Sequence, residues 1–375
     1  MKKLMIATIV AAMAVPCQAA DWEKTFVKTF AEAQKAAKAG DKLMYLHFTT
    51  TWCGWCRKIE KDVYASDEGA KLLEPFACAT LDCTVQGGKP AGEAKINIDL
   101  MKKYHVSGYP SLVIVDADGV VMHSWSGYVP LDAFGKELDK ATATRKDYKE
   151  FVAYAEKADK KGYEYNAKAM DVYSRVQMWD KAGDAAAQVR KLDEKNAKGD
   201  AARAAYVVYQ AATATDAGDD KVKAAVDDIR KFDPANEKGY LQEALWAQAM
   251  ALAQDNKLKE ASAVLADLTS KAAKLENPER VWVVAGQLQV ANGDNKAALE
   301  SAKKALDADS RTQRTLAMVG QLQAKAGDPK AAADSLQKAL DLDPNSQMAP
   351  AIKQMLQQVK KTIPASSPAA EKASD

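Results

Sequence analysis

The stretch TWCGWCRK at residues 51–58 places two cysteines, Cys53 and Cys56, three positions apart. It follows the apolar run LMYLHFT (residues 43–49), which predicts a buried strand, and it opens a helical pattern over residues 54–63. A cysteine at a helix N-terminus has its thiolate stabilised by free backbone N–H groups and by the positive end of the helix dipole. A second cysteine one turn later can attack a mixed disulfide formed by the first. This spacing therefore predicts a dithiol/disulfide pair in which Cys53 is the nucleophile.

Two further cysteines, Cys78 and Cys83, lie downstream of this pair. Together the four could be read as a zinc or iron–sulfur site, but Cys78 and Cys83 fall in a predicted strand rather than in a flexible turn. They are five positions apart, so on an extended strand they face opposite sides. We therefore expect no metal and no cofactor. One interpretation is that Cys78 and Cys83 are simply small side chains buried in the core, and the other is that Cys83 is an auxiliary thiol.

Strand patterns alternate with helix patterns between residue 22 and about residue 143. Asp118 and Gly119 predict a hairpin turn between the last two strands. This order predicts an α/β fold in which helices flank both faces of a mixed sheet. The expected helices are residues 22–38, 54–63, 67–73, 98–104 and 131–138, and the expected strands are residues 43–49, 76–83, 112–115 and 120–125.

The first 20 residues have the layout of a secretory signal. Lys2 and Lys3 precede an apolar run from Leu4 to Val15, and small residues precede Asp21. The run is shorter than the roughly 20 apolar residues that span a bilayer. Residues 1–20 are therefore predicted to be a cleaved signal peptide, and an N-terminal anchor or a lipidated cysteine is the alternative. The mature protein is expected to be periplasmic or otherwise exported, and soluble.

The charge of the mature chain excludes one class of partner. Removing Lys2 and Lys3 lowers the number of basic residues from 53 to 51, which equals the 51 acidic residues. A chain with no net charge has no overall field to hold a polyanion, so we expect no nucleic acid and no anionic lipid surface among its partners.

From about residue 145 the composition changes and a period of 34 residues emerges. The sequence GQLQ at 286–289 returns at 320–323, and KALD at 304–307 returns at 338–341. This period resembles that of tetratricopeptide repeats, whose unit is a helix pair. We expect four or five pairs between about 150 and 360, only the last two close to the family pattern. An irregular helical bundle is the alternative for the upstream part.

The repeat pattern also predicts which side chains are buried. The leucines at equivalent positions of the two clearest repeats are expected in the core, and the first helix of each pair is expected to contact a partner. The expected core residues are Leu288, Leu306, Leu322 and Leu340, and the candidate contact residues are Trp282, Gln289, Arg314 and Gln323.

Two motifs in the first part resemble the thioredoxin-fold family. WCGWC (residues 52–56) follows one strand, and VSGYPS (residues 106–111) precedes another. The resemblance is closest to the thioredoxin-like domain of bacterial thiol:disulfide interchange proteins. It implies that Pro110 is cis and faces the cysteines, that the backbone of Tyr109 pairs with a substrate strand, and that Trp52 supports the site.

The sequence departs from this family at one buried position. The family usually has an acid six residues before the first cysteine, which relays a proton to the second cysteine, and this chain has His47 there. The lysine that often pairs with that acid aligns with Thr80. His47 can serve as the relay because the ordinary pKa of imidazole is near 6.5, or it can simply pack in the core.

The expected organisation is a signal peptide (1–20), a thioredoxin-like domain (21–145), an all-α repeat domain (146–361) and a disordered tail (362–375). The expected function is that of an exported thiol:disulfide oxidoreductase acting on cysteines of envelope proteins. Its partners are protein thiols or disulfides, an electron donor or acceptor such as a membrane reductant, and a protein bound by the repeats. The alternative is a chaperone-like adaptor whose repeats hold clients and whose redox site is secondary.

Overall fold

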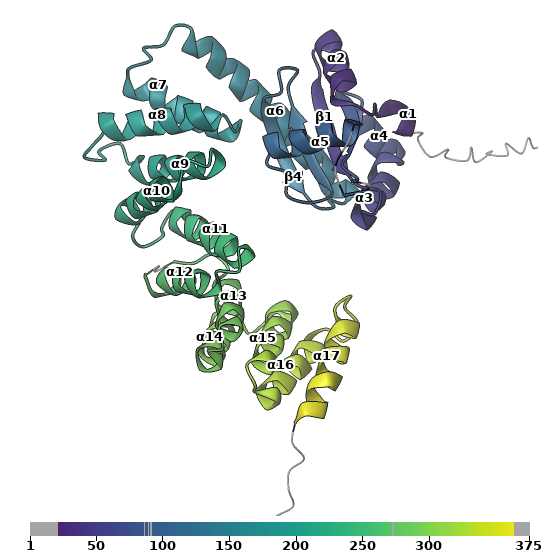
Figure 1. Cartoon of the computed structure of the whole chain (residues 1–375), viewed down its shortest axis with the longest axis vertical. Coiled ribbons are helices and arrows are strands. Elements are labelled where there is room, and N and C mark those ends of the chain that lie inside the picture. Colours follow the sequence, from purple (N-terminus) through teal and green to yellow (C-terminus); the bar gives the residue numbers. More distant parts are fainter. Residues whose placement is uncertain (1–21, 86, 89, 91, 272–273, 364–375) are drawn as a thin grey trace, which may run out of the picture. The chain divides into compact units, whose positions relative to one another are not determined.

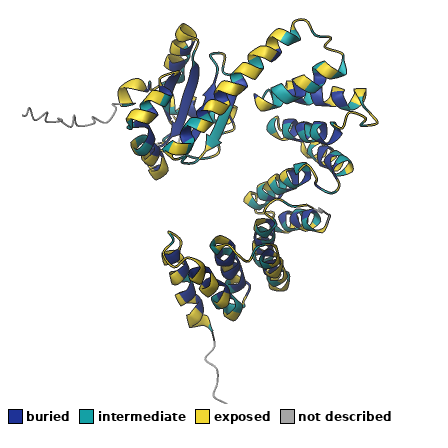
Figure 2. Cartoon of the chain, turned by 180° about the vertical axis from the view of Figure 1, so that it is seen from behind, coloured by how far each residue is buried: buried dark blue, intermediate teal, exposed yellow. Residues whose placement is uncertain are grey.

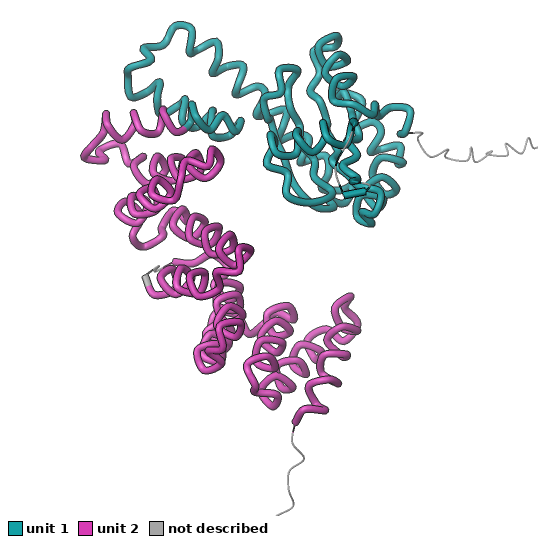
Figure 3. Tube along the Cα trace, in the orientation of Figure 1, with its two compact units in different colours: residues 1–182 teal, residues 183–375 magenta. Residues whose placement is uncertain are grey.

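The structure, a computed structural model, describes residues 22–363 apart from 86, 89, 91, 272 and 273 (Figure 1). The expected signal peptide and the tail from residue 364 lie outside the described residues. The chain divides into two compact units, residues 1–182 and residues 183–375, which Figure 3 colours separately.

The first unit is built on a four-stranded sheet with the order β2-β1-β3-β4. Strands β1 and β2 are parallel, and β3 is antiparallel to both β1 and β4. This mixed sheet confirms the predicted fold class. The strands are β1 (Leu43–Thr49), β2 (Phe76–Asp82), β3 (Ser111–Val115) and β4 (Val121–Ser126).

Helices cover both faces of this sheet. All seven residues of β1 are therefore buried, and its five apolar residues are divided between two apolar clusters, one on each face. Tyr45 lies in one cluster, with residues of α3, α4 and α6, whereas Phe48 lies in the other, with residues of α2 and α5. The bounds are α1 (Trp22–Thr25), α2 (Phe30–Gly40), α3 (Gly54–Ile59), the π-helical turn η1 (Glu60–Tyr64), α4 (Asp67–Leu73), α5 (Gly92–Lys103) and α6 (Leu131–Ala155).

The single helix expected over residues 22–38 is wrong, because the chain leaves helical geometry at Val27. The backbone N–H of Val27 donates to Cys78 and its carbonyl accepts from Thr80, both at 3.0 Å, so Val27 pairs with the outer edge of β2. Thr29 then caps α2 by accepting from the backbone N–H of Glu32 at 3.2 Å. A long-range pairing has replaced the local helix.

Helix α6 is much longer than the predicted 131–138 and runs to Ala155 without a break. The domain boundary expected at residue 145 lies inside this helix. The next helix, α7 (Tyr163–Arg175), also belongs to the first unit, and Val176 after it is buried in the same cluster as Tyr45. The compact unit that holds the sheet therefore extends beyond the residues with strand-and-helix alternation.

The second unit consists of helix pairs, each burying one side against its neighbours (Figure 2). Gly293 and Gly327 adopt φ values of 81° and 90° in the turns within the last two pairs, as glycine allows. The helices from residue 179 are α8 (Trp179–Leu192), α9 (Ala201–Ala214), α10 (Asp219–Phe232), α11 (Tyr240–Gln254), α12 (Leu258–Lys271), α13 (Pro278–Ala291), α14 (Asn295–Ala308), α15 (Gln313–Lys325), α16 (Pro329–Leu342) and α17 (Ala349–Thr362).

Three of the four leucines expected in the core of the repeats, Leu288, Leu322 and Leu340, are buried, and Leu306 is half-buried. Of the candidate partner contacts, Gln323 is buried and Gln289 is half-buried. The Oε1 atom of Gln289 accepts from Ser301 and that of Gln323 accepts from Ser335, each at 2.8 Å, so both side chains link the two helices of a pair. Burial makes Gln323 unsuited to contact a partner.

None of the helices over the described residues is both long enough and apolar enough to cross a membrane.

Candidate redox site

Cys53 and Cys56 form a disulfide at the start of α3, with their Cα atoms 5.3 Å apart. Cys53 is the N-cap residue of this helix, and its Sγ accepts from the backbone N–H of Cys56 at 3.1 Å. That N–H points at the sulfur and the helix dipole adds positive potential, so the position favours a thiolate once the disulfide is reduced. The local geometry predicted from the sequence is present.

Each cysteine of the disulfide directly follows a tryptophan that contacts a tyrosine. The ring centroids of Trp52 and Tyr109 are 5.6 Å apart in a T-shaped arrangement, and those of Trp55 and Tyr128 are 5.9 Å apart. The Tyr109–Pro110 peptide bond is cis, as the resemblance implied. The loop that carries it is tied down because the carbonyl of Pro110 accepts from the N–H of Gly127 at 2.8 Å.

His47 lies on β1 and is fully buried. It is paired in register with Thr80 of β2, as the sequence comparison with the family expected. Neither ring nitrogen of His47 has a hydrogen-bond partner among the described residues. The ring packs against Tyr64, with the two ring centroids 5.5 Å apart. Burial lowers the pKa of His47 to about 3, so this imidazole is neutral at physiological pH.

A carboxyl group that the sequence reading missed lies beside this histidine. The Oε1 atom of Glu60 is 3.9 Å from Nδ1 of His47, and its side chain is only 21% exposed. Burial raises the pKa of Glu60, although Arg57 nearby opposes that shift. Glu60 follows Cys56 by four residues, which is one helical turn, so the two side chains lie on the same face of the α3–η1 segment.

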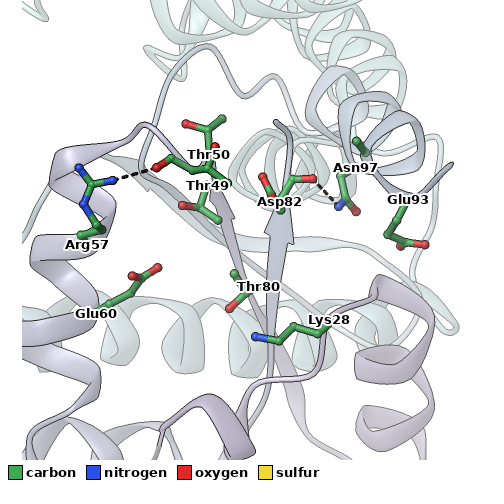
Figure 4. Close-up of a pocket in the computed structure, with 11 residues that line it drawn as sticks. Lys28, Thr49, Thr50, Arg57, Glu60, Thr80, Asp82, Glu93 and Asn97 are labelled. Atoms are coloured by element: carbon green, nitrogen blue, oxygen red, sulfur yellow. Dashed lines mark hydrogen bonds between the residues drawn. The ribbon is translucent and has the colours of Figure 1, made fainter. Parts of the chain in front are cut away.

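A hollow of about 640 Å³ connects Glu60 with the surface of the protein. It lies where β1 and β2 end, between the α3–η1 segment and α5, as Figure 4 shows. The buried Thr50 Oγ1 and Asn97 Oδ1 have no hydrogen-bond partner among the described residues, and both side chains line the hollow. Such a polar space can hold water that exchanges protons with Glu60.

Cys78 and Cys83 are both buried and belong to the clusters on opposite faces of the sheet, which confirms the prediction that they diverge. Burial raises the pKa of Cys78 to about 12 and that of Cys83 to about 11. Within the described residues, no group of three or more histidines, cysteines and carboxylates could hold a metal ion.

Two residues of the site, Glu60 and Tyr128, were not singled out from the sequence. Glu60 could have been found, because a carboxylate four residues after a cysteine shares its helical face. Tyr128 had no such signal, since it approaches Trp55 only after the chain has passed through β3 and β4.

Comparison with family models identifies both parts of the chain. Residues 30–142 match the model described as a thioredoxin-like domain. Residues 279–312 and 313–346 match the tetratricopeptide repeat, in agreement with the two clearest copies in the sequence.

Two curated relatives are each similar to part of this chain. The disulfide bond reductase DsbH of Chlamydia pneumoniae is 32% identical over 98 residues, which cover 24% of this chain and 57% of the relative. Protein disulfide-isomerase 1 of Dictyostelium discoideum is 33% identical over 78 residues, which cover 20% of this chain and 19% of the relative. The chain thus spans just over half of one relative and about a fifth of the other.

Among solved structures, one of a DsbH oxidoreductase has 23% sequence identity and a TM-score of 0.29, and the match covers 38% of this chain and 94% of that one. A tetratricopeptide-repeat protein, YrrB, has 17% identity and a TM-score of 0.37, and the match covers 54% of this chain and 97% of that one.

Proposed function

Because the chain joins a thioredoxin-like domain to tetratricopeptide repeats, we propose that it is an exported thiol:disulfide oxidoreductase whose repeats bind a protein partner. The observation that carries this proposal is the Cys53–Cys56 disulfide at the N-terminus of α3, with Cys53 in the N-cap position. The names of both curated relatives support the same class of reaction.

In the reducing direction the proposed cycle starts with the Cys53 thiolate, which attacks one sulfur of a substrate disulfide. The substrate S–S bond breaks, a mixed disulfide forms, and the first substrate thiol leaves with a proton. The Cys56 thiolate then attacks Sγ of Cys53 and releases the second substrate thiol. Two electrons have passed from the protein dithiol to the substrate, and a donor must reduce Cys53–Cys56 again. In the oxidising direction the same steps run backwards.

Cys56 must lose a proton before it attacks, and we assign the acceptor role to Glu60 with His47 beside it. Glu60 shares a helical face with Cys56, and its raised pKa brings the carboxyl closer to neutral pH, where a general base works best. His47 stays neutral and lies beside the carboxyl, with its Nδ1 atom 3.9 Å from Oε1 of Glu60. This assignment moves the proton-accepting role that the sequence suggested for His47 onto its neighbour.

The proposed site residues are Cys53 and Cys56 as the redox pair and Glu60 as the proton acceptor, with Trp52, Tyr109, Pro110 and His47 in supporting roles. The proposed location is the periplasm or another exported compartment, after cleavage of residues 1–20. The proposed substrates are cysteines of envelope proteins, and the electron donor or acceptor is a separate protein, with a membrane reductant as one candidate.

Insulin reduction by dithiothreitol tests the activity and separates it from the chaperone-like alternative. The full-length protein should accelerate insulin precipitation, and Cys53→Ser should abolish the acceleration because the attacking sulfur is gone. Protection of an unfolded client by the repeats should be measured with the same two proteins. An undiminished protective effect in Cys53→Ser, together with no insulin reduction by the wild type, would instead support the adaptor.

A second test follows the resolving step. Cys56→Ser leaves Cys53 able to form a mixed disulfide but removes the thiol that resolves it, so covalent adducts with substrates should accumulate. Non-reducing gels and mass spectrometry detect them. The double variant Cys53→Ser/Cys56→Ser is the matched control and should trap nothing.

The direction of electron flow follows from the potential of Cys53–Cys56 in equilibrium with glutathione. A reduction potential of about −270 mV would indicate a reductase, and one of about −120 mV would indicate an oxidase.

A further inference from the structure

Trp52 and Trp55 are the two most exposed large apolar side chains in the part of the chain that the structure describes. Trp52 is 69% exposed and Trp55 is 60% exposed, and the next in order is 52% exposed. Each tryptophan directly precedes one of the disulfide cysteines. An exposed indole leaves a large apolar area in water, and covering that area is favourable. Their placement beside the reacting sulfurs points to contact with the molecule that brings its own sulfur there.

The two tryptophans contact different tyrosines. Trp52 contacts Tyr109, which packs with the cluster of Phe48, whereas Trp55 contacts Tyr128, which packs with the cluster of Tyr45. These clusters lie on opposite faces of the sheet, so the tyrosines of the two aromatic pairs pack against opposite faces. The Trp52 pair adjoins the cis-proline loop, where the family resemblance already places a substrate strand. The Trp55 pair lies on the other side and has no role in the proposed cycle.

The Trp55–Tyr128 pair is held in place by polar contacts at its rim. The hydroxyl of Tyr128 donates to Asp62 at 3.0 Å, and the Lys58 ammonium lies 4.9 Å from the centre of the Tyr128 ring. Lys58 also pairs with Asp62. A ring fixed in this way loses little side-chain freedom when a ligand covers it. The surface is therefore preorganised for an apolar contact.

The exposed indoles indicate which disulfides this surface disfavours. Lys58 is paired with Asp62, whereas the Arg57 guanidinium donates to the neutral carbonyl of Thr51 at 2.9 Å and keeps its charge. A small disulfide such as oxidised glutathione carries no apolar side chain large enough to cover an indole, so it gains nothing from the exposed tryptophans.

We propose that Trp55 and Tyr128 form a side-chain subsite that selects polypeptide substrates with an aromatic or aliphatic residue beside the reacting cysteine. This inference rests on the proposed function, since it assumes that Cys53 and Cys56 exchange with a substrate disulfide. The substrate class is an unfolded or partly folded segment, because such neighbours of a cysteine are normally buried in a folded protein.

The test compares three probes with the reduced full-length protein. Two are seven-residue peptides whose single cysteine is disulfide-linked to 2-mercaptoethanol, one with phenylalanine and one with serine on both sides of the cysteine. The third is 2-hydroxyethyl disulfide, which has no side chains. Acid quenching and mass spectrometry give the rate constant for oxidation of Cys53 and Cys56. Dividing each peptide rate by the small-disulfide rate removes any change in cysteine reactivity.

The wild type should prefer the phenylalanine peptide over the serine peptide by about three- to tenfold, as expected for one aromatic contact. Trp55→Ala and Tyr128→Ala should each reduce this preference to near one. Tyr128→Phe keeps the ring and should keep the preference. Val152→Ala, which removes an exposed apolar side chain from α6, is the matched control and should behave as the wild type.

An equal rate for the two peptides in the wild type would overturn the inference, as would an unchanged preference in both alanine variants. A wild-type protein that fails to reduce 2-hydroxyethyl disulfide would overturn the proposed function itself. The two failures are therefore distinguishable in one set of measurements.

Discussion

At the scale of single residues, the four cysteines of the described chain differ sharply in environment. Cys53 caps a helix and is 4% exposed, whereas Cys56 is 1% exposed. Burial raises the pKa of Cys78 to about 12 and of Cys83 to about 11, so both remain thiols near neutral pH. Brief iodoacetamide treatment of the reduced protein should therefore label Cys53 first, as peptide mapping by mass spectrometry can show. First labelling of Cys83 would support the auxiliary thiol instead.

His47 should make the stability of the first unit depend on pH. The unfolded chain protonates this imidazole below about pH 6.5, whereas burial in the native state lowers its pKa to about 3. The unfolded state thus binds more protons between these values. Stability should fall as the pH drops from about 6.5 toward 3, by up to about 1.4 kcal/mol per pH unit.

Urea unfolding at about pH 7 and about pH 4 measures this effect. His47→Leu should lose less stability between the two conditions than the wild type. His105→Asn changes an exposed histidine with a φ of 52°, which asparagine accepts, and should keep the wild-type dependence. Equal losses in His47→Leu and the wild type would show that other groups cause the dependence.

At the scale of helices and strands, close helix contact in the repeats depends on glycine. A Cβ atom at Gly320 of α15 would lie 2.7 Å from Cγ of Leu336 and 3.2 Å from the carbonyl of Ala332, both on α16. Gly320→Ala should therefore destabilise the second unit by about 1–3 kcal/mol, measured by thermal unfolding.

The matched substitution Gly135→Ala tests whether the effect comes from packing. A Cβ atom at this position would meet only Leu72, at an ordinary 3.7 Å. Because alanine has the better helix propensity, the free energy of unfolding of the first unit should stay unchanged or rise by up to about 1 kcal/mol. A similar loss in both variants would contradict the packing argument.

The elements that the sequence predicted well are those with local causes. Strand β1 and helix α4 have the predicted bounds, since an unbroken apolar run marks one and the Ser66 cap marks the other. The break at Val27 and the approach of Tyr128 to Trp55 both depend on residues far away in sequence. No window of sequence contains those partners. The redox pair could be predicted because its geometry lies within four consecutive residues.

At the scale of the whole molecule, the first unit needs more chain than its alternating pattern suggests. Val176 is buried against the sheet cluster, and Tyr148, Tyr173 and Met178 pack around it. A chain ending at residue 145 loses all four, and burial of a single valine contributes about 1.5–3 kcal/mol.

A chain ending at residue 182 should therefore melt several degrees above one ending at residue 145, as circular dichroism can measure. Both should reduce a small disulfide at a temperature where they are folded, because Cys53 and Cys56 lie within either. Neither should process the physiological partner as fast as the full chain does. Equal melting temperatures would mean that residues 146–182 do not support the sheet.

The pairing of Val27 with β2 also covers part of one edge of the sheet. β2 is the outer strand on one side of the sheet, and Val27 occupies the outward backbone groups of Cys78 and Thr80. An uncovered edge strand is a template for extended chains, which add to it and start aggregates. The unfolded polypeptides proposed above as substrates would bring this risk close to the sheet. By occupying the backbone groups of Cys78 and Thr80, Val27 leaves such a chain a shorter free edge to pair with.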